Sequence, residues 1–199
     1  MRQVTGSNLT TENKKASIQV TLDGPSFSTE GVVVDESAEQ VTFVIDTPRV
    51  TLAPREEVSL DTAESLLRLA GHPCRSNECS VCSELQNDIV AIMAIDRTAL
   101  EIIIDKWGSR ASFSSPLLDM RHAEERCITV STSRKVCYIH HFDNGLQRAE
   151  AFEIGNEEDI LCLITEWQEV AGKETPIYIS GEHSRSRILS KYIKNIVCE

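Results

Sequence analysis

The chain has 199 residues, of which 41% are hydrophobic and 26% are charged, and it is long enough to bury a sizeable core as one domain or two small lobes. Its 20 Lys and Arg residues against 31 Asp and Glu residues give a formal net charge of -11. Such a surface repels phosphate backbones and anionic lipids, so we expect neither nucleic acid nor a membrane as a partner.

No apolar run approaches the roughly 20 residues that span a bilayer, and residues 1–15 hold no apolar stretch of the signal-peptide type. The number of cysteines is odd, seven, and several lie inside apolar runs, where a reduced thiol behaves as a small hydrophobic group. Both features predict a cytoplasmic protein without a disulfide framework.

After a loose polar tail over residues 1–15, the chain up to residue 125 predicts short strands and three helices. Strands over 18–22 and 27–34 flank an Asp23-Gly24 turn, which indicates a hairpin. Further strands are expected over 41–45, 50–52, 89–95 and 111–115. Helices are expected where a capping residue precedes an apolar stripe: from Asp61 to Gly71, from Asp96 to Gly108 with Trp107 in its stripe, and briefly over 117–125 after Pro116.

The second half predicts a regular succession of elements. Strands are expected over 128–130, 136–142 and 149–154, followed by a helix that Asn156 caps and Gly172 ends, with Trp167 in its buried stripe. A strand over 177–180, a helix over 184–194 and a strand over 196–198 complete the order βββαβαβ. Because the first half gives a shortened version of this order, we predict two similar α/β lobes, a reduced first lobe over 16–115 and a second over 116–199.

Five segments in a fixed order carry a resemblance to a known family: SIQVTLDGPSF (17–27), IDTPRVTLAP (45–54), SSPLLDM (114–120), TPIYISGE (175–182) and KYIKN (191–195). With them, the repeated meander followed by αβα resembles the actin, sugar-kinase and heat-shock chaperone ATPase superfamily. More narrowly, the chain resembles an uncharacterised bacterial family, a domain of unknown function with a degenerate actin-like ATPase fold. The resemblance implies an α/β fold of two ribonuclease H-like lobes of actin-like ATPase type, the first lobe shortened.

In that superfamily ATP lies between the lobes, with its phosphates on the first hairpin turn of each lobe and its adenosine on a glycine-rich turn near the last strands. By this resemblance Asp23 and Gly24 belong to the first phosphate turn, residues 131–135 form the second, and Gly181 remains of the adenosine turn. The same geometry would bring Asp23 and Glu182 together as paired carboxylates across the cleft.

The second phosphate turn, STSRK over residues 131–135, contains neither an aspartate nor a glycine. Backbone N–H groups cradle phosphates only where no Cβ blocks the approach, and one aspartate of two does not hold hydrated magnesium. The sequence therefore points away from ATP hydrolysis, and we expect no bound cofactor, with ATP and magnesium as the open alternative. The hydroxyls and the two cations of this turn also leave anion binding open, beside a plain polar hairpin.

The segment 71–84, GHPCRSNECSVCSE, is the sharpest chemical signal and is expected to form a loop. His72, Cys74, Cys79 and Cys82 are ligand types that zinc prefers, and the last two have the C-x-x-C spacing of a zinc knuckle. The three cysteines also match the C-x4-C-x2-C spacing of plant-type ferredoxins. The resembling family lacks this cluster, so we expect a reduced surface loop without metal, with the two metal sites as alternatives.

Other reactive side chains favour structural roles. His140 and His141 are neighbours on a strand and point to opposite faces, so they cannot chelate one ion together, and we expect one to be packed and the other solvated. Ser180 and His183 flank a turn that lacks the G-x-S-x-G elbow of a serine hydrolase. We therefore assign no catalytic residue.

The sequence favours a cytoplasmic protein of actin-like ATPase fold that binds nucleotide weakly or not at all and acts in interaction or assembly. Its partner is then an unidentified protein, with a second copy of this chain among the candidates. The first alternative is an active ATPase or kinase with atypical phosphate turns, and the second is a zinc- or redox-linked interaction module built on residues 71–84. Catalysis is the less favoured reading.

Overall fold

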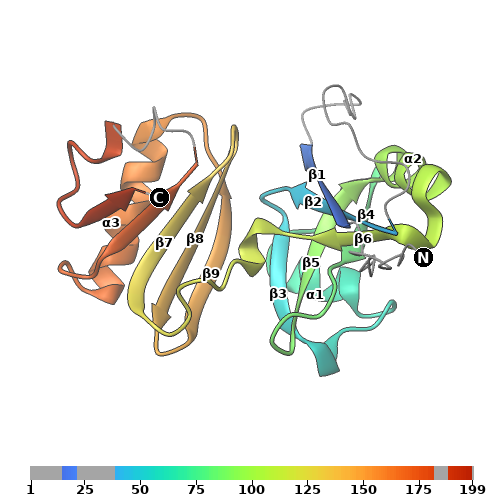
Figure 1. Cartoon of the computed structure of the whole chain (residues 1–199), viewed down its shortest axis with the longest axis horizontal. Coiled ribbons are helices and arrows are strands. Elements are labelled where there is room, and N and C mark those ends of the chain that lie inside the picture. The colour runs from blue at the N-terminus through green and yellow to red at the C-terminus, as the bar shows by residue number, and fades with distance from the viewer. Residues whose placement is uncertain (1–14, 22–38, 182–187, 199) are drawn as a thin grey trace, which may run out of the picture.

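The computed structural model describes residues 15–21, 39–181 and 188–198, and within them the strands form three sheets (Figure 1). The first sheet is parallel with the order β1-β2-β6, over Lys15–Thr21, Gln40–Asp46 and Ala111–Ser114. The second is antiparallel with the order β3-β5-β4, in which β3 covers Val50–Pro54, β4 covers Glu78–Cys82 and β5 covers Ile89–Asp96.

The third sheet has five strands in the order β11-β10-β7-β8-β9. Its antiparallel meander consists of β7, β8 and β9, over Arg126–Thr132, Val136–Asp143 and Leu146–Glu153. Strands β10 (Ile177–Ser180) and β11 (Ile196–Cys198) run parallel to β7. This succession agrees with the meander, helix and strand predicted for the second half.

Among the described residues, the α-helices with both ends defined are α1 over Ala63–Leu69, α2 over Arg97–Trp107 and α3 over Glu157–Ala171, and they lie against these sheets. Short 3-10 turns lie at Arg55–Glu57, Gly108–Arg110 and Pro116–Leu118. Figure 1 shows α3 beside the five-stranded sheet, and α1 and α2 beside the strands of the first half. Within the described residues, no helix combines the length and apolar character needed to cross a membrane.

The predicted caps of α2 and α3 are confirmed. The Asp96 side chain accepts hydrogen bonds from two N–H groups in the first turn of α2, and Asn156 forms a capping box with Asp159 at the start of α3. Such caps stabilise a helix by about 1 kcal/mol because they satisfy N–H groups that have no partner within the helix. Both helices end at the predicted glycine.

The predicted start of α1 at Asp61 is wrong. The helix begins at Ala63 after Thr62, and no side chain caps it. The Thr62 hydroxyl instead accepts from the Ser59 N–H at 2.8 Å and donates to the Glu57 carbonyl at 2.9 Å. This local turn holds residues 59–62 outside the helix, which explains the later start.

The predicted helix over 117–125 is also wrong. Only the turn Pro116–Leu118 is helical, because Asp119 has extended backbone with φ -72° and ψ 102° and ends it. Separate turns follow, in which the Ala123 N–H donates to Met120 and the Glu125 N–H donates to His122.

Several predicted elements lie outside the described residues, namely the 1–14 part of the tail, the Asp23-Gly24 turn, the strand over 27–34 and residues 184–187 of the helix predicted over 184–194. The described remainder of that helix is helical only at residues 188–189 and continues as turns to residue 192, so the prediction is wrong over 190–194. Strand β1, the first half of that hairpin, pairs in parallel with β2. The boundary between lobes at residues 115 and 116 stays a prediction.

The five-stranded sheet is covered on both faces. On one face α3 packs through a cluster of buried residues that includes Ile128, Val130, Ile164 and Trp167. On the other face, Val136, Tyr138 and Ala151 join a single core with strands of the first half. Burial on both faces explains the nearly continuous apolar run of β8. The cluster on the face away from α3 is therefore a core that the first and second halves of the chain share.

Tyr138 supplies the polar contact within that shared core. Its hydroxyl donates to the Asp46 carboxylate at 2.8 Å and accepts from the Thr47 N–H at 3.0 Å, and its side chain is almost fully buried. Burial, reinforced by the Asp46 charge, raises the pKa of Tyr138, so the hydroxyl keeps the proton that it donates. Asp46 and Thr47 are thereby tied to β8 in the middle of the third sheet.

We predict that Tyr138→Phe lowers the free energy of unfolding by about 2 kcal/mol, because the buried Asp46 carboxylate and Thr47 N–H both lose this partner. Urea unfolding at neutral pH measures the change. The matched control is Tyr192→Phe at an exposed tyrosine, where we expect a change within about 0.5 kcal/mol. Equal stability of the two variants would show that the contact contributes nothing.

Candidate functional site

The fold brings the predicted second phosphate turn and Gly181 to the same edge of the five-stranded sheet. Ser131 on β7 pairs with Ser180 on β10, and the two strands are parallel, so residues 131–135 and Gly181 follow them at their carboxyl ends. Ligands of open α/β sheets bind at such ends. The role that the resemblance implies for these residues stays a prediction.

Gly181 packs directly against Thr132. It has φ +127°, and a Cβ built on it would lie 2.5 Å from the Thr132 carbonyl oxygen and 2.6 Å from its Oγ1. Real Cβ atoms do not approach backbone so closely, and side chains rarely adopt this φ. Contact between neighbouring strand ends is therefore a sufficient reason for glycine at this position, without any nucleotide.

The turn itself uses its own backbone donors. The Ser133 N–H donates to the Val136 carbonyl at 2.9 Å, and the Val136 N–H donates to the Ser133 hydroxyl at 3.2 Å. Thr132 is buried, and its Oγ1 makes no hydrogen bond among the described residues. The remaining candidates of this site, Asp23, Gly24, Glu182 and His183, lie outside the described residues.

The cysteine segment is not the predicted loop, because Glu78–Cys82 forms the edge strand β4. Cys79 and Cys82 are three residues apart on that strand and therefore point to opposite faces. Cys79 packs against the core shared by the two halves, whereas Cys82 and Cys74 pack against the cluster beneath α1. One ion cannot bind both ends of this C-x-x-C motif in the strand geometry.

Electrostatics around this segment favour neutral side chains. Burial raises the pKa of the Cys74, Cys79 and Cys82 thiols, so they are poor nucleophiles at neutral pH. Burial, followed by the Arg49 charge, lowers the pKa of His72. Arg49 itself forms an ion pair with Glu78 at the start of β4.

The two strand histidines point to opposite faces of the sheet, as predicted. His140 is buried, and its Nε2 donates to the Leu117 carbonyl at 2.9 Å while Nδ1 accepts from the Thr129 hydroxyl at 3.0 Å. Burial lowers the pKa of His140, which keeps it neutral. His141 is half-buried, not solvated, and its Nε2 makes no hydrogen bond among the described residues.

Both tryptophans are core residues, as predicted. Trp107 packs edge-on against Phe43, and Trp167 packs edge-on against Phe152. The Arg148 guanidinium lies 4.3 Å from the Trp167 ring centre, on the edge strand β9. Neither ring is a free platform for a ligand.

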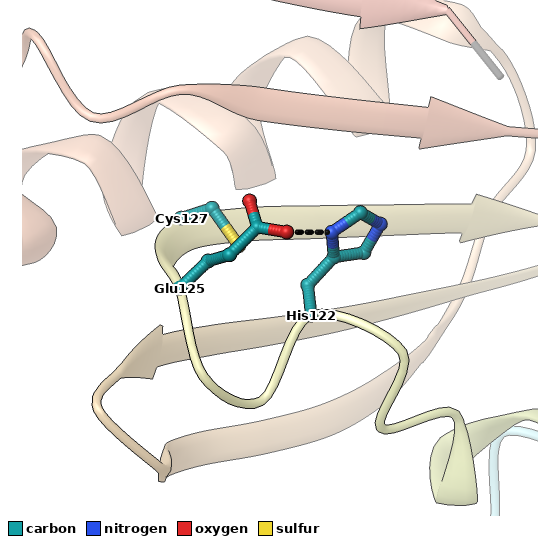
Figure 2. Close-up of side chains that lie close together, drawn as sticks. All are labelled: His122, Glu125 and Cys127. Atoms are coloured by element: carbon teal, nitrogen blue, oxygen red, sulfur yellow. Dashed lines mark hydrogen bonds and ion pairs between the residues drawn. The ribbon is translucent and has the colours of Figure 1, made fainter.

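A cluster that the sequence reading missed lies at the amino end of β7. His122, Glu125 and Cys127 each offer a ligand atom, and the three atoms lie within 4.8 Å of one another (Figure 2). His122 Nδ1 is 3.0 Å from Glu125 Oε1, and hydrogen bonds from His122 and Tyr178 lower the pKa of Glu125. Within the described residues, no other group of His, Cys, Asp and Glu side chains meets this distance.

The sequence signal for the cluster was its spacing, with three ligand types inside the six residues HAEERC. Read as a helix, the segment placed only His122 and Glu125 on one face. The observed turns over residues 120–125, followed directly by β7, bring Cys127 to the same place. A turn here could not be told from a helix by apolar periodicity alone.

We predict that Gly181→Ala is more destabilising than Gly145→Ala. Gly145 has a similar φ of +131°, but nothing lies within 4 Å of its Cβ position, so this variant carries only the backbone strain of about 1–3 kcal/mol. Gly181→Ala adds the clash with Thr132, which we expect to cost about 1–3 kcal/mol more. Chemical unfolding of both variants measures the difference, and equal losses would contradict the contact.

Comparison with solved structures identifies the fold. The chain is similar to a Bacteroides thetaiotaomicron protein with actin-like ATPase fold and unknown function, with a TM-score of 0.67 and 22% identity over 82% of this chain and 69% of that one. Two further likenesses, both at 10% identity, are too weak to support an inference. The AlfA filament bound to AMPPNP has a TM-score of 0.39 over 80% of this chain and 51% of that one. The cytoplasmic domain of EpsL, an inner membrane component of the Vibrio cholerae type II secretion system, has a TM-score of 0.44 over 92% of this chain and 84% of that one.

No protein-family model and no curated protein matches the sequence. The resemblance inferred from the sequence is nevertheless confirmed at the level of fold, since the similar Bacteroides protein also combines an actin-like ATPase fold with unknown function. A likeness at 22% identity shows the fold alone. The chain is a mixed α/β protein with the actin-like ATPase fold.

Proposed function

We propose that this chain is a protein-interaction or assembly factor, built on two ribonuclease H-like lobes with a shortened first lobe, and that it binds nucleotide weakly or not at all. The observation that carries the proposal is the packing of Thr132 against Gly181. The two places where the superfamily holds phosphates and adenosine touch each other here, at atoms that leave no room for a Cβ.

The phosphate turn supports this proposal through its hydrogen bonds. A phosphate cradle needs backbone N–H groups that point at the ligand. In the 131–135 turn, the Ser133 and Val136 N–H groups are used within the turn, and no carboxylate is present that could orient hydrated magnesium. Glycine, which would let a phosphate approach, is absent from this turn as well.

The burial of Asp46, in the first half of the chain, also supports weak or absent nucleotide binding. It lies at the end of β2, where the fold brings an acidic side chain against the second half. Its carboxylate accepts a hydrogen bond from Tyr138 and is 5% exposed. A carboxylate in this position serves the contact between the halves and is not open to a hydrated cation.

Exposed apolar side chains support action through protein contacts. A surface pocket of about 240 Å³ has a mixed lining, in which the polar residues Arg55, Ser59 and Ser83 accompany Val58, Leu60, Cys82, Leu85 and Val90. This volume is below the range of about 300–1,000 Å³ typical of small-molecule sites, and it suits one apolar side chain of a partner. Leu60 is 96% exposed and Leu85 is 53% exposed at its rim, where burial against a protein would be favourable.

The state of the cysteines supports the cytoplasm as its location. Cys74, Cys79, Cys82 and Cys162 form no disulfide among the described residues, and Cys162 is exposed on α3. Thiols of this kind persist where glutathione keeps proteins reduced.

The decisive experiment is a thermal-shift titration of the full chain with ATP, ADP and magnesium, beside a turnover assay. A ligand present at 100 times its dissociation constant stabilises the folded state by about 2.7 kcal/mol, which gives a clear rise in Tm. We expect no rise up to millimolar nucleotide. A nucleotide-binding actin-like ATPase serves as the positive control, and a rise in Tm together with ATP turnover would contradict the proposal and establish the ATPase alternative.

A further inference from the structure

The His122–Glu125–Cys127 cluster lies on the face of the five-stranded sheet opposite α3. Cys127 alternates along β7 with Ile128 and Val130, which face α3, so its side chain points to the other face. Figure 2 shows His122 and Glu125 on the turn before β7 with the imidazole and the carboxylate facing each other, and the Cys127 sulfur beside the Glu125 side chain. Three different ligand types therefore converge from one short segment and the first residues of a central strand.

From this convergence we propose that His122, Glu125 and Cys127 bind one divalent ion of the zinc class. Imidazole, thiolate and carboxylate are the three protein ligands that zinc takes, at bond lengths of about 2.0–2.3 Å. Tetrahedral geometry at those lengths separates the ligand atoms by about 3.3–3.8 Å. His122 Nδ1 and Glu125 Oε1 are already 3.0 Å apart, and all three ligand atoms lie within 4.8 Å, so small rotations of side chains close the site.

Tyr178 holds two of the ligands in place. Its hydroxyl is 3.0 Å from Glu125 Oε2, and its ring stacks on His122 with centroids 4.2 Å apart and planes 16° from parallel. Tyr178 lies on β10 and pairs with Thr129 on the neighbouring strand β7. A hydrogen bond to the second carboxylate oxygen leaves Oε1 for the ion, which is how supporting residues orient metal ligands.

The cluster has one exposed ligand, Glu125, through which an ion can enter, and one buried ligand, Cys127, that holds it. The Glu125 side chain is 48% exposed and the His122 side chain 14% exposed, whereas Cys127 is fully buried. The ion reaches the site from the carboxylate side, and the fourth position of a tetrahedron is left for water from the same direction. A site with three protein ligands and one water is open, in contrast to a closed structural site.

The protonation of two residues, Cys127 and His122, changes when the ion binds. The Cys127 thiol releases its proton to solvent, because the thiolate is the ligand. His122 Nδ1, which donates its proton to the Glu125 carboxylate in the free protein, loses that proton to solvent, and the neutral ring keeps or takes up a proton on Nε2, so that the Nδ1 lone pair faces the ion. The Glu125 carboxylate binds through Oε1, because the Tyr178 hydroxyl donates to its other oxygen, Oε2.

The test is a titration of chelator-treated full-length protein with Co²⁺, followed by displacement with Zn²⁺, in the absence of nucleotide. We expect a thiolate-to-cobalt charge-transfer band that saturates at one ion per chain and disappears as Zn²⁺ is added. Cys127→Ser should remove the band. His122→Gln and Glu125→Gln should weaken Zn²⁺ binding by roughly 10–100-fold or more.

Matched controls use groups of the same type outside the cluster. Cys162→Ser removes an exposed thiol, Cys79→Ser removes a thiol of the C-x-x-C motif, and Glu124→Gln removes the carboxylate next to Glu125. All three should bind Co²⁺ and Zn²⁺ like the unchanged chain. Loss of the band in Cys79→Ser would assign the metal to residues 71–84 and overturn the proposal.

Because Cys127 is fully buried, Cys127→Ser can fail to fold. In that case the Zn²⁺ affinities of His122→Gln and Glu125→Gln test the proposal. Zn²⁺ affinity within twofold of the unchanged chain in both His122→Gln and Glu125→Gln would overturn the proposal, as would the absence of a saturating band in the unchanged chain. The readout is independent of ATP, so failure of the metal site and failure of the proposed function are separate outcomes.

Discussion

The buried contact of Tyr138 with Asp46 and Thr47 is the constraint on which the arrangement of the two halves depends. It lies inside an apolar core that both halves share, where a polar group without partners would cost about 1–3 kcal/mol. The contact therefore fixes β8 against the end of β2. Because β8 is hydrogen-bonded to β7, it also fixes where the 131–135 turn lies.

Strand β7 separates two chemically different places. Cys127 at its amino end and Thr132 at its carboxyl end are five residues apart, a distance of about 17 Å along an extended strand. Their side chains also point to opposite faces, since five is an odd number of steps along a strand. At the carboxyl end Thr132 packs against Gly181, whereas at the amino end three side chains of metal-ligating types lie close together. An ion bound at one end would not occupy the other.

Much of the second half follows from local signals in the sequence. Asn156, the acidic first turn and the stripe ending at Ala171 define α3, and residues 143–145 form the turn that the sequence indicates. The first half depends more on long-range pairing. Strand β4 contains cysteines and a serine and shows no apolar alternation, so its sequence alone predicts a loop at the C-x-x-C motif. It becomes a strand by pairing with β5. The His122 cluster was missed because its geometry depends on Tyr178, more than 50 residues away.

We propose that the end of β7 and β10 is a packed strand edge and not a nucleotide site. Amide hydrogen exchange of the full chain, with and without millimolar ATP and magnesium, tests it at the residues concerned. The account predicts that the Ser133 and Val136 amides, already hydrogen-bonded within the turn, exchange at the same rate under both conditions. Slower exchange over residues 131–136 and around Gly181 when nucleotide is added would contradict it.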